Sequence, residues 1–140
     1  MKKLSNKTAL ITGGNSGIGF ASAKRFIEEG ATVIITGRRE DALKEAVEKL
    51  GGSASYKVAD VSSVDNISAM AESLKNEGVT LDVIFANAGI AFFSPLTETT
   101  EEFFDNQFNI NSHGLENGEA VVYESPNPLT ELTSGTTYYV

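Results

Sequence analysis

The sequence of 140 residues has no cysteine and no run of 18 or more apolar residues. The first absence excludes a disulfide framework and a thiolate metal site, and the second argues against a membrane-spanning helix. The apolar stretch after the basic N-terminus is interrupted at Thr12-Gly13-Gly14, too early for the apolar core of a signal peptide. We therefore expect a cytoplasmic chain. The formal net charge of −8 also argues against general nucleic-acid binding, which needs a basic surface.

Basic residues are missing from the second part of the chain. All 11 Lys and Arg lie between Lys2 and Lys75, and ten acids follow Lys75 without a compensating base. A solvated acidic face would explain this distribution, and so would a change of module near the C-terminus. His113 is the single histidine and has no carboxylate cluster at metal-ligand spacing, so we expect no metal site.

Strand and helix signals alternate from residue 8 to about residue 111. Short apolar runs predict four buried strands, at residues 8–12, 31–36, 55–61 and 81–86. Amphipathic patterns between and after them predict helices that start at Gly17, Glu40, Ser62 and Thr99. Buried strands separated by helices pair in parallel, so we predict an α/β fold with a doubly wound sheet, truncated to about four strands in the order 3-2-1-4.

Hydroxyl residues and aromatic spacing give details of two of these helices. Ser62 with Asp65, and Thr99 with Glu102, have the spacing of a capping box at a helix N-terminus. Phe103, Phe104 and Phe108 follow Thr99 at helical spacing, and we expect them in the core.

A glycine-rich segment, T-G-G-N-S-G-I-G at residues 12–19, lies between the first predicted strand and the first predicted helix. In this setting Gly13 allows a tight turn, Gly17 lets a pyrophosphate approach the main chain, and Gly19 lets the helix pack closely on the sheet. The free N–H groups of the first helical turn would face the anion. Glycines alone indicate only a turn, but the flanking strands and helix favour a Rossmann-type dinucleotide site.

The spacing G-x3-G-x-G resembles the T-G-x3-G-I-G signature of the short-chain dehydrogenase/reductase family, and three further segments match that family in order. Asp60-Val61 resembles its adenine-binding pair, and Asn87-Ala88-Gly89 resembles its N-A-G motif. Residues 104–111 resemble its fourth helix, which places Asn111 at the active-site asparagine. The resemblance covers residues 1–112. The cofactor-binding residues that it implies are Gly13, Asn15, Ser16, Gly17, Ile18, Gly19, Arg38, Arg39, Asp60, Val61, Asn87, Ala88 and Gly89.

The residues after the second strand indicate which dinucleotide is bound. Members of the family that prefer NAD carry an acid there, whereas this chain has Gly37 followed by Arg38 and Arg39. A guanidinium is the natural partner of a 2′-phosphate, so we predict NADP(H) over NAD(H). Alternatively, the two arginines only start the next helix and pair with Glu40 or Asp41.

The catalytic residues that the resemblance implies are a Ser and a Tyr-x3-Lys, and this sequence contains no Tyr-x3-Lys. Asn111 would then be a catalytic-site residue without its tyrosine and lysine. Three hypotheses stay open. In the first, the chain is an NADP(H)-binding half-domain of a truncated or chimeric reductase. In the second, it is an active NADPH-dependent carbonyl/alcohol oxidoreductase, completed by a tail tyrosine (Tyr123, Tyr138 or Tyr139) or by a partner chain. In the third, it is a structural self-association module with an idle nucleotide site.

Residues 113–140 differ in character from the rest. They hold two of the three prolines and two β-rich runs, at residues 119–124 and 136–140, separated by turn signals. The pattern resembles a β-repeat of phage tail and bacterial surface proteins. We therefore predict two units, a nucleotide-binding half-domain at 1–112 and a β-hairpin-like tail of different origin at 113–140. The hairpin would cover the edge of the fourth strand, and a homo-oligomer would form through the sheet edge or the tail.

Overall fold

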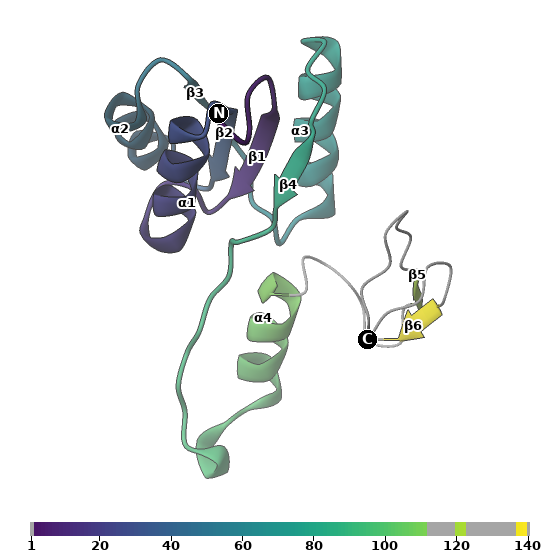
Figure 1. The fold of residues 1–140 in the computed structure, drawn as a ribbon. Coiled ribbons are helices and arrows are strands. Elements are labelled where there is room, and N and C mark those ends of the chain that lie inside the picture. The colour runs from purple at the N-terminus through teal and green to yellow at the C-terminus, as the bar shows by residue number, and fades with distance from the viewer. Residues whose placement is uncertain (1, 112–119, 123–136, 140) are drawn as a thin grey trace.

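The computed structural model describes residues 2–111, 120–122 and 137–139, and helices and strands alternate through its first part (Figure 1). The elements in that part are β1 (Thr8–Thr12), α1 (Gly17–Glu28), β2 (Thr32–Gly37), α2 (Glu40–Leu50), β3 (Ala54–Val58), α3 (Val64–Asn76), β4 (Val83–Phe85), the 3₁₀ turn η1 (Leu96–Glu98) and α4 (Glu101–Asn111).

The four strands form one parallel sheet in the order β3-β2-β1-β4, which confirms the predicted order. In the register of the sheet, Leu10 at the centre of β1 lies beside Ile34 of β2 and Ile84 of β4. Because parallel strands run in the same direction, the segments that follow all four strands meet at one edge of the sheet.

Alternating residues of β1 and β2 divide the core between the two faces of the sheet. Ile11 and Ile35 are fully buried on the face covered by α1 and α2, where they pack with Leu43. Leu10 and Ile34 point to the other face and pack with Met70 and Leu74 of α3. Figure 1 shows α1 and α2 on one side of the sheet and α3 on the other.

Both predicted helix caps are wrong by one residue. The residue before α3 is Ser63, whose Oγ accepts a hydrogen bond from the Asn66 N–H at 3.3 Å. Thr100 Oγ1 likewise accepts from the Phe103 N–H at 3.1 Å at the start of α4. The sequence offers two adjacent hydroxyl residues at each helix start, and their other contacts decide which one caps the helix.

The phenylalanines predicted for the core lie outside it. Phe104 is 61% exposed, and Phe103 and Phe108 are only half-buried. They pair with aromatic neighbours instead, Phe104 with Phe108 at 6.1 Å and Phe103 with Phe92 at 6.3 Å between ring centroids. Figure 1 shows α4 beyond the carboxyl end of β4, where it covers neither face of the sheet. Helical spacing predicts an apolar stripe, but not what covers it.

Two short strands belong to the predicted tail, β5 (Ala120–Val122) and β6 (Thr137–Tyr139). They pair antiparallel, as expected for a hairpin-like segment, and form a two-stranded sheet of their own. Neither strand pairs with β4, so the expectation that the hairpin covers the edge of β4 by strand pairing is wrong. The remaining predicted tail residues, among them His113 and Tyr123, lie outside the described residues. Of the helices in the described ranges, none is long and apolar enough to cross a membrane.

Candidate functional site

A cavity of about 610 Å³ opens where the segments following the four parallel strands meet. Its lining residues are Gly13, Asn15, Ser16, Gly37, Arg38, Arg39, Ala59, Asp60, Val61, Asn87, Ala88, Gly89 and Ile90. All but three of the residues predicted to bind a cofactor are among them. The three others, Gly17, Ile18 and Gly19, form the first turn of α1, directly after Ser16. Gly37, Ala59 and Ile90 line the cavity without having been predicted to bind.

The glycine turn leaves space where an anion would have to approach the backbone. Gly17 has a φ of +54°, and a Cβ added to it would meet no heavy atom within 4 Å. Gly13 has a φ of +65°, and its N–H donates to the Thr36 carbonyl at 2.8 Å. The turn is therefore held against β2 while Gly17 stays open.

Two other glycines of the turn are needed for close packing. A Cβ on Gly19 would lie 2.3 Å from the Gly13 carbonyl oxygen and 2.6 Å from Asn87 Nδ2. Gly19 thus allows α1 to approach the turn and Asn87, a more specific role than the predicted packing of the helix on the sheet. A Cβ on Gly14 would lie 2.5 Å from Ile35 Cγ2, so Gly14 lets the turn pack closely on β2. The Gly-Gly pair is the signal of this packing in the sequence, and the prediction did not include it.

Thr12, at the end of β1, holds the segment that follows β4. Its Oγ1 accepts hydrogen bonds from the Asn87 N–H at 2.9 Å and the Ala88 N–H at 2.8 Å. Its carbonyl accepts from Asn87 Nδ2 at 3.0 Å. Thr12 is only 6% exposed, so these bonds fix one wall of the cavity relative to the glycine turn. The sequence alone indicates no separate role for Thr12, because its partners are 75 and 76 residues away.

Asn111, the predicted catalytic-site residue, connects α4 to the same wall. Its Oδ1 accepts from the Ile90 N–H and its Nδ2 donates to the Ile90 carbonyl, both at 2.9 Å. A Cβ on Gly89 would lie 2.8 Å from Asn111 Oδ1, so only glycine fits there without displacement. The amide of Asn111 therefore positions the segment that follows Gly89.

The charged residues of the cavity are two arginines and one carboxylate. Arg38 and Arg39 are exposed, and neither forms an ion pair with Glu40 or Asp41 in the described part of the chain. Glu40 binds Lys44 and the Tyr56 hydroxyl instead, both at 3.0 Å, so the alternative in which the arginines pair with these acids is wrong.

Asp60 is held in its ionised form. Its Oδ1 accepts from the Ser62 hydroxyl at 2.7 Å and from the Ser62 N–H at 3.0 Å. These two hydrogen bonds, with a smaller contribution from the charge of Arg38, lower the pKa of Asp60 below its ordinary value. The lining of the cavity therefore carries both a carboxylate and positive charge.

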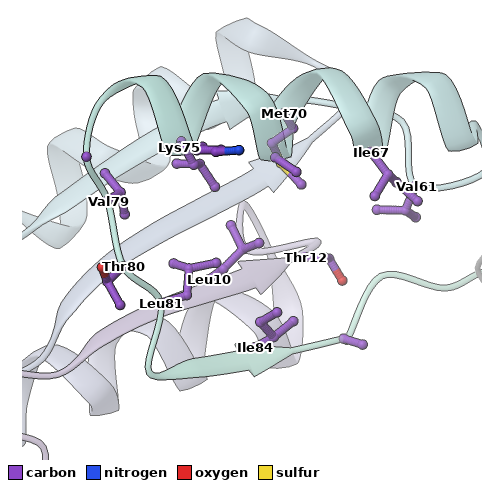
Figure 2. Close-up of a pocket in the computed structure, with 14 residues that line it drawn as sticks. Leu10, Thr12, Val61, Ile67, Met70, Lys75, Val79, Thr80, Leu81 and Ile84 are labelled. Carbon is purple, nitrogen blue, oxygen red and sulfur yellow. The ribbon is translucent and has the colours of Figure 1, made fainter. Parts of the chain in front are cut away.

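A larger cavity, of about 770 Å³, lies on the sheet face that α3 covers (Figure 2). Figure 2 shows Ile67 and Met70 of α3 facing Leu10 and Ile84 of the sheet across it. The lining is mostly apolar and contains neither the glycine turn nor an arginine. A charged dinucleotide therefore fits the smaller cavity at the strand ends better than this one.

Comparisons with known proteins agree with this geometry. The family model described as short chain dehydrogenase matches residues 7–125. An oxidoreductase of Sarocladium schorii, asL5, is 43% identical over 114 residues, which cover 81% of this chain and 46% of that protein. The 3-oxoacyl-(acyl-carrier-protein) reductase FabG of Chlamydia muridarum is 40% identical over 136 residues, 94% of this chain and 54% of that protein.

A solved structure of a short chain dehydrogenase/reductase family protein superposes with a TM-score of 0.73 at 33% identity, over 81% of this chain and 46% of that one. The chain spans about half the length of the curated relatives it matches. The family match, these identities and the shared sheet lead to one conclusion: the chain belongs to the short chain dehydrogenase family.

Proposed function

We propose that this chain binds NADP(H) in the cavity at the strand ends and forms the cofactor-binding part of a short-chain dehydrogenase that interconverts carbonyl and alcohol groups. The observation that carries this proposal is the convergence, in one cavity of about 610 Å³, of the glycine turn, the Asn87–Gly89 segment and two arginines without ion pairs to the neighbouring acids. The nicotinamide, when bound, supplies or accepts the hydride.

The residues present fit such a cofactor. The open space at Gly17 and the free N–H groups of the first turn of α1 would hold the pyrophosphate. Asp60 and Val61 would contact the adenine, and the Asn87–Gly89 segment would line the ribose next to the nicotinamide. Arg38 and Arg39 supply the positive charge that a 2′-phosphate requires, and Gly37 leaves no acid to repel it.

We also propose that residues 1–112 form this unit and that residues 113–140 are a separate β-rich tail. The tail's composition and the separate pairing of β5 with β6 support the division. The family match itself continues past this boundary, to residue 125.

The chemistry of hydride transfer to a carbonyl needs a proton donor of suitable pKa within hydrogen-bond reach of the substrate oxygen. The sequence has Asn111 but no Tyr-x3-Lys. We therefore propose that this chain by itself binds the cofactor without turnover, and that an active site would need residues from a further polypeptide segment.

Two measurements on the full chain test the proposal. We expect a fluorescence titration to show saturable NADPH binding, tighter than NADH binding, and a steady-state assay of NADPH oxidation with a panel of ketones to show no rate above buffer. Absence of saturable binding by either nucleotide would overturn the binding function. Turnover above buffer would overturn the proposed lack of catalysis and favour the active-oxidoreductase alternative.

A further inference from the structure

One wall of the proposed cofactor site continues into residues 90–92, which lie against α4. Ile90 lines the cavity at the strand ends, and Phe92 follows it two positions later, outside the lining. Figure 1 shows that the chain runs away from the sheet after β4 and that α4 brings it back alongside. The position of this wall therefore depends on what holds the segment beyond the sheet.

Three residues of α4, spaced four apart, hold this segment. Asn111 binds both the N–H and the carbonyl of Ile90. Gln107 Oε1 accepts a hydrogen bond from the Phe92 N–H at 2.9 Å. One turn further along the helix, the Phe103 ring meets the Phe92 ring at 6.3 Å between centroids and at an interplanar angle of 57°. Residues four apart lie one above the other on a helix, so these three contacts come from one face of α4.

The repeats of the two backbones match along this face. Residues two apart in an extended segment are separated by roughly 6.6 Å along the chain, and four residues of an α-helix rise by about 6 Å. The main chain at Ile90 and Phe92 can therefore meet the successive amide side chains of Asn111 and Gln107. A contact at Ile90 alone would leave the segment free to turn about that point, whereas a second contact at Phe92 fixes its direction.

We propose that Gln107 is a positioning residue of the cofactor site, which keeps the wall at Ile90 in the geometry that accepts the nicotinamide end of a dinucleotide. This inference rests on the proposed function. Gln107 is not among the residues that line the cavity, so it acts through the Phe92 N–H and not by touching the ligand. NADPH and NADH share the nicotinamide end, and Gln107 therefore supports the binding of both without distinguishing them.

Calorimetric titration of three ligands into the full chain tests this role: NADPH, NADH and adenosine 2′,5′-bisphosphate, which has only the adenine end of NADPH. We expect Gln107→Met to weaken NADPH and NADH binding by the same factor, about three- to tenfold, the effect of one lost hydrogen bond. Binding of the bisphosphate should stay as in wild type, which also establishes that the variant is folded.

Two further variants serve as controls. Gln107→Glu keeps an acceptor oxygen at the same position and should bind all three ligands as wild type does. Asn106→Leu removes an amide from an exposed position on the same helix and should change none of the affinities. Amide hydrogen exchange measured by NMR follows the bond itself: the Phe92 N–H should exchange faster in Gln107→Met and at the wild-type rate in Gln107→Glu.

The outcomes separate this inference from the proposed function. If wild type binds none of the three ligands, the proposed function fails. If wild type binds NADPH and Gln107→Met binds it equally tightly, the inference is wrong and the proposed function stands. Equal weakening of NADPH and the bisphosphate in Gln107→Met would also overturn the inference, because Gln107 would then stabilise the whole site and not its nicotinamide end. Unchanged exchange of the Phe92 N–H in Gln107→Met would overturn it as well.

Discussion

At the scale of single residues, Thr12 and Thr36 are neighbours in the sheet register that use their hydroxyl groups differently. Thr12 Oγ1 accepts the N–H groups of Asn87 and Ala88, whereas Thr36 Oγ1 is buried and has no hydrogen-bond partner among the described residues. A buried donor that loses its acceptor carries the full cost of its desolvation, but an already unpartnered hydroxyl has no such bond to lose.

We therefore expect Thr12→Val to lower the free energy of unfolding by about 2 kcal/mol, because two N–H groups lose their acceptor. Thr36→Val should change it by less than about 0.5 kcal/mol or raise it, since a methyl group replaces an unpaired hydroxyl at a buried site. Urea denaturation of both variants measures the difference. Equal losses for the two variants would mean that the Thr12 bonds do not stabilise the wall of the cavity.

At the scale of single elements, two adjacent serines before α3 have separate roles. Ser63 Oγ caps the helix by accepting from the Asn66 N–H, while Ser62 donates its hydroxyl and its N–H to Asp60 in the cavity. The same short segment therefore starts a helix and holds a carboxylate of the candidate site.

Replacement of each serine by alanine separates these roles. Ser63→Ala should lower the free energy of unfolding by about 1 kcal/mol, the usual cost of a lost helix cap, and leave the pKa of Asp60 in place. Ser62→Ala should raise the pKa of Asp60 toward its ordinary value, because the Ser62 hydroxyl bond is the largest cause of its lowering. NMR titration of Asp60 and urea denaturation distinguish the two variants. The assignment would be contradicted if the pKa of Asp60 did not rise in Ser62→Ala, or if the free energy of unfolding fell more in Ser62→Ala than in Ser63→Ala.

Local sequence predicts the bounds of an element best where a clear stop signal ends it. β1 and α2 have the predicted bounds, because an apolar run or a helical stripe ends at glycines in each case. β3 and β4 are shorter than predicted. Asp82 lies just outside β4, where its N–H donates to the Thr8 carbonyl at 2.9 Å and its carboxylate accepts from the Thr8 N–H and from Lys7. Such contacts join residues more than 70 positions apart, and no periodicity contains them.

The candidate site likewise has parts that the sequence predicts and parts that only the structure reveals. The glycine turn and the Asn87-Ala88-Gly89 segment were predictable because each is a short motif next to a strand. The Thr12–Asn87 bonds and the packing of Gly14 on Ile35 were not, since they depend on which strands lie side by side.

At the scale of the whole molecule, one edge of the sheet is apolar and pairs with no other strand among the described residues. β4 is an outer strand of the sheet, and Ile84 at its centre is 66% exposed. Ile84 also lines the apolar cavity, across from α3 (Figure 2). An unpaired edge strand next to apolar surface favours association between copies of a chain. This edge therefore supports the predicted homo-oligomer better than the tail, whose strands pair with each other.

Ile84→Lys tests the role of this edge. We expect wild type to elute from size exclusion with light scattering as a dimer or larger species, and Ile84→Lys to shift toward the monomer, because a charge on the edge opposes pairing. Val64→Lys, at a similarly exposed position on α3, should leave the distribution of wild type unchanged. A monomeric wild type would contradict association through β4.

The central claim, that a dinucleotide binds at the glycine turn, is tested most directly by calorimetric titration of NADPH into Gly17→Ala. Gly51→Ala is a matched control, since both glycines have a positive φ and open space around an added Cβ, and only Gly17 adjoins the cavity. We predict saturable binding with equal affinity for wild type and Gly51→Ala, and at least about a tenfold weaker affinity for Gly17→Ala, because its methyl group occupies the space of the phosphate. Wild-type affinity in Gly17→Ala would contradict the account.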